Sequence, residues 1–164
     1  MKKPFFFAVL WEAGWWLRRR GERSRVFGLA AARAKELGLP LCVVGAPDSG
    51  PTVGPGCGDI TLDIAPSACP NFIWSDITKT IPLPAASCVV FVSCTLEYVD
   101  DFDAAMRELH RIAGAEIYNV RVEPWSFVWW GVGYERAKRV LPWKNGKIPP
   151  VTPAFHAFGF RRIE

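Results

Sequence analysis

The hydrophobic pattern is clearest in the middle of the chain, where two apolar runs flank an amphipathic segment. The first run, Val89 to Val92, is β-branched and aromatic, which is typical of a strand buried on both faces. From Phe102 to Ala113 the apolar residues fall on one helical stripe, and Asp100 or Asp101 can cap its N-terminus. Ile117 to Val122 is the second run. Strand, helix and strand form a β-α-β unit, which predicts a parallel sheet.

Further elements extend this sheet. Residues 22–38 predict a helix with one buried stripe, which Gly38 ends. Three more strands are predicted at Leu39–Val44, Asp59–Ile64 and Asn71–Ser75. A last strand that starts at Phe155 can close the sheet in the antiparallel direction. The expected fold class is α/β, a Rossmann-like and mainly parallel sheet. Its crossover helices are shortened, because loops rich in glycine and proline stand where two of them would lie.

The first twenty residues stand apart in the pattern. Phe5 to Leu17 is an apolar run interrupted only by Glu12, and three arginines at positions 18–20 follow it. A helix of this length spans about 20 Å, short of the roughly 30 Å hydrocarbon core, so we do not expect it to cross a bilayer. Three interpretations stay open: a helix packed on the domain's own core, an in-plane membrane helix, or a segment that docks to a protein partner. We therefore divide the chain into residues 1–20 and one domain over residues 21–164.

Charge follows the same division. The 164 residues have a net charge of +4, but both ends are basic, whereas residues 45–123 hold most of the acidic groups. All the tryptophans except Trp74 lie in the basic ends. Arginines beside tryptophan-rich blocks suit a membrane surface or a larger protein assembly better than a phosphate groove, so no nucleic-acid partner is expected.

The five cysteines are an odd number without a C-x-x-C pair. Cys42, Cys88 and Cys94 lie in or beside apolar strands, where a buried thiol behaves as a small hydrophobic group. We therefore expect neither a disulfide framework nor a metal site. Free cysteines also predict a reducing, cytoplasmic location, peripheral to a membrane or within a large assembly.

The candidate site lies at the carboxyl ends of the first four strands, where ligands bind in sheets of this type. Its residues are Gly45, Ala46, Asp63, Asp76, Ile77, Ser93 and Cys94. The turn at Gly45 would let the backbone approach a ligand. Asp63 can accept from both hydroxyls of a ribose, and Asp76 from an adenine amino group. Both aspartates can equally serve as turn formers at strand ends.

One stretch of the chain resembles a known family. SCTLEYVDDFDAAMRELHRIAG, residues 93–114, is similar to the segment after the fourth strand of small class I S-adenosylmethionine-dependent methyltransferases of the type 11 group. There, a V-L-E-H-V-x-D run leads into a helix of A-x-x-E-L-x-R-x-L type. Asp76-Ile77 and Ile81 to Pro84 resemble the group's D…LPFPD segment. The resemblance implies S-adenosylmethionine as cofactor, with its methionine part at Gly45 and Ala46, its ribose at Asp63, its adenine at Asp76, and the substrate beside Ser93 and Cys94.

The first-strand motif departs from the family pattern, acidic-x-Gly-x-Gly-x-Gly. Val43 occupies the acidic position, and Pro47 and Ser49 replace the second and third glycines. Two functions are therefore expected. One is a methyltransferase acting on an unknown, membrane-associated acceptor; the other is a non-catalytic, methyltransferase-like structural subunit of a membrane-associated or multi-protein assembly, such as a virion.

Methyl transfer is an in-line displacement in which positioning supplies much of the rate, so it requires neither a metal nor a nucleophilic side chain. If the acceptor needs a general base, four side chains are candidates. These are Glu97, Tyr98, His110 and His156.

Overall fold

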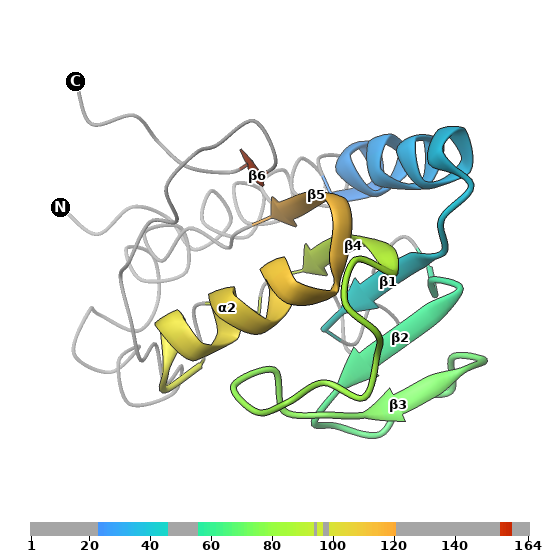
Figure 1. Cartoon of the computed structure of the whole chain (residues 1–164). Coiled ribbons are helices and arrows are strands. Elements are labelled where there is room, and N and C mark those ends of the chain that lie inside the picture. Colours follow the sequence, from blue (N-terminus) through green and yellow to red (C-terminus); the bar gives the residue numbers. More distant parts are fainter. Residues whose placement is uncertain (1–22, 46–55, 94, 97–98, 121–154, 159–164) are drawn as a thin grey trace, which may run out of the picture.

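A computed structural model of the chain describes residues 23–45, 56–93, 95–96, 99–120 and 155–158 (Figure 1). The predictions made for residues 1–20, Ala46, Cys94, Glu97 and Tyr98 lie outside these ranges. On the last strand, only the side chain of His156 is described. No helix within the described ranges is both long enough and apolar enough to cross a membrane.

The described strands form one six-stranded sheet in the order β3-β2-β1-β4-β5-β6, and every pairing in it is parallel. The strands are β1 (Leu41–Val44), β2 (Ile60–Asp63), β3 (Phe72–Trp74), β4 (Cys88–Ser93), β5 (Ala113–Val120) and β6 (Phe155–Phe158). This is the strand order of doubly wound α/β folds, in which the order reverses between the first and fourth strands. The predicted α/β class with a parallel, Rossmann-like sheet is confirmed.

The last strand runs in the opposite direction to the predicted one. β6 runs parallel to β5, with Ile117 opposite Phe155 and Val120 opposite Phe158. The prediction of an antiparallel last strand is wrong. Residues 121–154 connect the two strands, and this connection exceeds the dozen or so residues that a parallel crossover needs, so the chain can return to the same end of the sheet.

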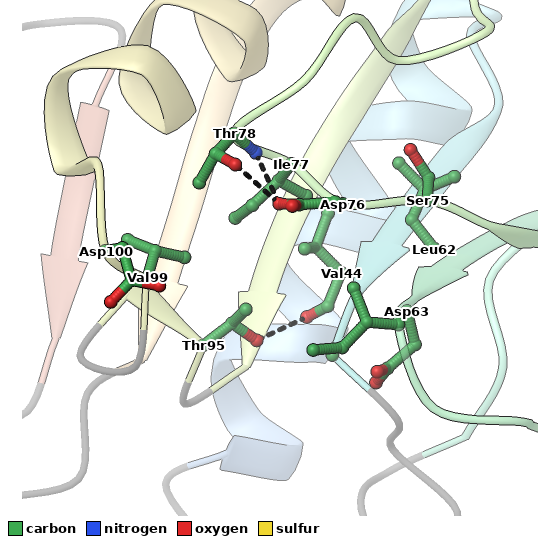
Figure 2. A pocket seen from close by; sticks show the side chains of 12 residues that line it. Val44, Leu62, Asp63, Ser75, Asp76, Ile77, Thr78, Thr95, Val99 and Asp100 are labelled. Carbon is green, nitrogen blue, oxygen red and sulfur yellow. Dashed lines mark hydrogen bonds between the residues drawn. The ribbon is translucent and has the colours of Figure 1, made fainter. Parts of the chain in front are cut away.

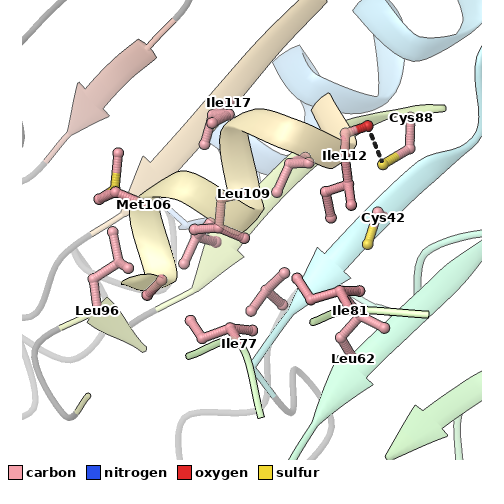
Figure 3. Close-up of a cluster of buried hydrophobic side chains, with 14 of the residues drawn as sticks. Cys42, Leu62, Ile77, Ile81, Cys88, Leu96, Met106, Leu109, Ile112 and Ile117 are labelled. Carbon is pink, nitrogen blue, oxygen red and sulfur yellow. Dashed lines mark hydrogen bonds between the residues drawn. The ribbon is translucent and has the colours of Figure 1, made fainter. Parts of the chain in front are cut away.

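The two central strands are buried at every position, as their uninterrupted apolar runs predict. Cys42, Val44 and Val90 face a core under α2 (Phe102–Ile112), which also contains Leu109 and Ile112 from that helix (Figure 3). The alternate positions face the helix over residues 23–37 on the other side of the sheet. They include Val43, Val89 and Phe91, packed with Val26 and Ala30. The structure is therefore a sheet between two helical layers (Figure 1).

Both described helices end or begin with the cap that the sequence indicates. The Asp101 carboxylate accepts a hydrogen bond from the Ala104 amide at 2.9 Å and caps α2. After the helix over residues 23–37, Gly38 has φ +65°, and the amides of Gly38 and Leu39 donate back to the carbonyls of Lys35 and Ala34. This pair of bonds is the Schellman motif, which glycine favours because a β-carbon is strained at this φ.

A polar clamp on α2 holds the connection between β3 and β4, which contains no helix. Arg111 donates to the carbonyls of Ile81 and Leu83 at 2.8 and 2.9 Å, and Glu108 accepts from the Ile81 amide at 3.0 Å. The Arg111 guanidinium also binds Glu108 at 2.8 Å and lowers the pKa of that carboxyl below its usual value. These contacts satisfy backbone groups that a crossover helix would otherwise pair internally.

A disulfide joins Cys57 and Cys69, whose α-carbons lie 5.4 Å apart. The expectation that no cysteine is paired is wrong for these two. They precede β2 and β3, which are parallel neighbours, so the loops that enter these strands meet at the amino edge of the sheet. The bond therefore ties together the described ends of the two connections that lead into β2 and β3. The prediction of a reducing location rested on free cysteines and loses that basis.

Candidate functional site

A pocket of about 150 Å³ lies at the carboxyl ends of β1, β2 and β3 (Figure 2). Its described walls come from four parts of the chain: Val44 and Gly45, Leu62 to Ile64, Ser75 to Thr78, and the segment before α2 with Thr95, Val99 and Asp100. Because Thr95 follows β4, the pocket reaches the boundary between β1 and β4, where the strand order reverses. This is the position at which doubly wound sheets bind their ligands.

The structure brings four of the seven predicted site residues to this pocket: Gly45, Asp63, Asp76 and Ile77. Ser93 does not line it. The Ser93 side chain is buried and accepts a short hydrogen bond from Arg23, which belongs to the helical layer over residues 23–37. Val92 on β4 faces α2, and successive side chains of a strand point to opposite faces. The Ser93 side chain therefore points to the face that the helix over residues 23–37 covers. Ala46 and Cys94 are not among the described residues.

Gly45 is required where it stands, but the reason differs from the predicted one. Its φ is +93°, and a β-carbon added there would lie 2.3 Å from the Thr95 hydroxyl and 2.6 Å from the Ser93 carbonyl. The Thr95 hydroxyl in turn donates to the Ser93 carbonyl at 3.0 Å. The glycine thus lets the end of β1 approach the end of β4, and it contributes backbone to the pocket wall.

The Asp63 carboxylate lies at the end of β2 and takes part in a turn. Its Oδ1 accepts from the Ala65 amide at 2.8 Å, and the Asp63 backbone carbonyl accepts from the Ser75 amide at 3.0 Å. The turn fixes the side chain at the pocket rim. A carboxylate has about four acceptor positions, so this bond leaves capacity to accept from a ligand hydroxyl.

Asp76 forms a second turn after β3. Its Oδ1 accepts from the Thr78 amide at 2.9 Å and from the Thr78 hydroxyl at 2.7 Å (Figure 2). Ile77, the next residue, is buried in the core under α2 and also lines the pocket. Asp63 and Asp76 therefore both form turns, as one of the two sequence predictions states. They also line one pocket, as the other prediction, a ligand site, requires.

The polar lining of the pocket has one sign of charge. Three of its described lining residues are carboxylates, namely Asp63, Asp76 and Asp100, and none of these lining residues is basic. Such a lining disfavours phosphate and favours a ligand that is neutral or cationic, since like charges at short range repel. The hydroxyls of Ser75, Thr78 and Thr95 add donors and acceptors.

Neither described histidine serves this pocket. His110 is exposed on α2. His156 lies on β6, at the far edge of the sheet from β3, where its ring stacks on Tyr118 with centroids 4.6 Å apart. The proposed bases Glu97 and Tyr98 are outside the described ranges. Among the described lining residues, the carboxylates of Asp63, Asp76 and Asp100 are the side chains that can act as bases.

His156 belongs instead to a network around Glu116. The Glu116 carboxylate accepts from Tyr118, from Arg33 at 2.9 Å, and contacts His156 at 3.1 Å. Burial works to raise the pKa of Glu116, but the hydrogen bonds from Tyr118 and Arg33 outweigh it and leave the pKa lowered. Burial and the adjacent carboxylate raise the pKa of Tyr118 to about 12. The network therefore links β5, β6 and the helix over residues 23–37.

Sequence reasoning missed several residues of the site. Thr78 carries a local signal, because a hydroxyl two residues after an aspartate is typical of a turn. Thr95 carries none, since its role depends on β1 and β4 being neighbours. The described residues contain no group of three or more His, Cys, Asp or Glu side chains able to hold a metal ion.

Comparison of the chain with protein-family models, with curated proteins and with solved structures gave no match.

Proposed function

We propose that the chain binds S-adenosylmethionine in the pocket at the carboxyl ends of β1, β2 and β3 and that it is an S-adenosylmethionine-dependent methyltransferase. The observation that carries this proposal is that Asp63, the last residue of β2, and Asp76, two residues after β3, line one pocket at the carboxyl ends of these neighbouring strands. The resemblance of residues 93–114 to type 11 methyltransferases supports the same ligand.

The charge of the pocket supports this cofactor over a dinucleotide. S-adenosylmethionine carries a sulfonium, an ammonium and a carboxylate group, so it is net positive and has no phosphate, whereas dinucleotides present a pyrophosphate. The carboxylates of Asp63, Asp76 and Asp100 attract the first kind of ligand and repel the second. In the proposed complex, Asp63 accepts from the ribose hydroxyls, and the backbone at Gly45 lies beside the methionine part.

The chemistry proposed for the site depends on positioning. The acceptor atom must approach the sulfonium methyl in line with the bond that breaks, and the lone pair of the acceptor forms the new bond while S-adenosylhomocysteine leaves. The acceptor's proton, where it has one, passes to solvent or to a carboxylate at the rim, such as Asp100. Water exclusion by Ile77 and Val99 strengthens the electrostatic attraction of the cofactor.

A second function has an observation in its favour. Asp63 and Asp76 each hold a local turn, so both are explained without a ligand. On that basis, the chain would be a non-catalytic, methyltransferase-like subunit whose basic, tryptophan-rich ends contact a membrane or a larger assembly. The two functions differ in one measurable property, which is affinity for the cofactor product.

Calorimetric titration with S-adenosylhomocysteine tests the proposal. The wild-type chain should bind, and Asp63→Ala should weaken binding by about 100-fold or more, because two hydrogen bonds to a charged acceptor are lost. Asp63→Asn keeps an acceptor for the Ala65 amide but removes the charge, so its affinity should lie between those of the wild type and Asp63→Ala. Glu36→Gln, an exposed acid on the other side of the fold, is the matched control and should bind normally. If the wild type does not bind at millimolar ligand, the proposed methyltransferase activity is contradicted, and the non-catalytic structural subunit is the function that stays.

A further inference from the structure

Trp74 is an exposed aromatic side chain that the fold holds in place. It is the last residue of β3, the edge strand of the sheet (Figure 1), and 68% of the residue is exposed. Its indole N–H nevertheless donates to the Ile64 carbonyl at 2.9 Å. That bond fixes the edge of the ring while its face stays open. The open face of an aromatic ring that is held in place is a surface on which a planar ligand can stack.

The register of the sheet places Trp74 next to Asp63, although Trp74 is not itself one of the residues that line the pocket. In the parallel pairing of β2 and β3, Trp74 is directly opposite Asp63, so the two side chains project from the same face of the sheet. Neighbouring strands lie roughly 4.8 Å apart. A separation of this order also divides the hydroxyls of a ribose from the base that the sugar carries. A ribose held by Asp63 therefore has its base within reach of the indole.

The alternative position for the base, at Asp76, is less open than the sequence indicates. One oxygen of that carboxylate already accepts from both the amide and the hydroxyl of Thr78. Trp74 has no such local role for its ring face, and its partner Ile64 adds exposed aliphatic surface that also lines the pocket.

We infer that the base of a nucleoside bound through Asp63 stacks on the face of Trp74. The inference rests on the proposed function, because it assumes that Asp63 holds a ribose. Stacking reads the π face of a base and not its edge, so the platform accepts different bases with similar strength. Trp74 is then a binding residue that sets affinity, while the selection of adenine would come from contacts elsewhere.

The test measures binding of S-adenosylhomocysteine and adenosine to the full chain and to variants at position 74. Trp74→Ala should raise the dissociation constant of both ligands about tenfold or more, within the range known for loss of a stacking partner. Trp74→Phe keeps an aromatic face without the indole N–H and should recover most of the affinity. Trp74→Leu keeps apolar bulk without the π face and should resemble alanine. Leu37→Ala removes an exposed apolar side chain at the amino edge of the sheet and should bind as the wild type does.

The outcomes separate this inference from the proposal beneath it. If the wild type binds, Asp63→Ala does not, and Trp74→Ala binds with unchanged affinity, the base lies elsewhere and only the stacking inference fails. Equal losses for Trp74→Phe and Trp74→Ala would also overturn it, since the hydrogen bond and not the ring face would then matter. If the wild type binds neither ligand, the proposed function fails and the inference falls with it.

Discussion

Replacing Phe91 by alanine is expected to lower the free energy of unfolding by about 3–5 kcal/mol. Phe91 is fully buried at the centre of β4, and its ring packs edge-on against Phe27 with centroids 5.5 Å apart at 89°. The loss combines the transfer free energy of the ring with the cavity that it leaves. Because small domains have total stabilities of about 5–15 kcal/mol, the variant should be unfolded to a large extent at moderate urea concentrations.

Urea unfolding followed by circular dichroism measures this effect. Leu29→Ala is the matched control, because Leu29 is 43% exposed on the helix that covers Phe91 and its loss should change stability by about 0.5 kcal/mol or less. A loss below about 1 kcal/mol for Phe91→Ala would contradict burial of β4 between two helical layers.

Removal of the disulfide is expected to have the second-largest effect. Cys57→Ser should lower the free energy of unfolding by about 3 kcal/mol, the loss of chain-entropy restraint for a loop of this size, since the two cysteines are 12 residues apart. Thermal or urea unfolding under non-reducing conditions gives the measurement.

Removing either cysteine breaks the same disulfide, which provides the controls for this prediction. Cys69→Ser should cost as much as Cys57→Ser, the double variant should cost no more than either, and a reductant should bring the wild type to the same stability. A double variant whose loss equals the sum of the two single losses would show that the cysteines act separately. Because the bond lies at the amino edge, binding of S-adenosylhomocysteine by the folded variants should be retained.

The central part of the fold follows from local patterns in the sequence. The apolar runs of β1 and β4 and the stripe of α2 depend only on the order of residues, and the structure confirms all three. Asp63 and Asp76 were found in the same way, because parallel strands bring their carboxyl ends to one edge. Patterns of this kind act over a few residues, so they predict elements and the places where the elements end.

The features that the sequence did not predict depend on which elements become neighbours. The Cys57–Cys69 bond exists because β2 and β3 are adjacent, and the contact of Gly45 with Thr95 exists because β1 and β4 are adjacent. Neither contact has a local signature. The direction of β6 is of the same type, since a strand of four residues has the same pattern in either direction. Ser93 was misplaced by one step of the strand alternation, which turns it to the other face.

The most direct measurement is an amide chemical-shift map of the isotope-labelled full chain titrated with S-adenosylhomocysteine. We expect the largest changes at Gly45, at Asp63, along Asp76 to Thr78, and at the indole N–H of Trp74. The amides around Glu116 and His156, at the other side of the sheet, should stay constant and serve as the internal control. No change at millimolar ligand, or changes confined to the region of Glu116 and His156, would contradict a nucleoside site at the carboxyl ends of β1, β2 and β3.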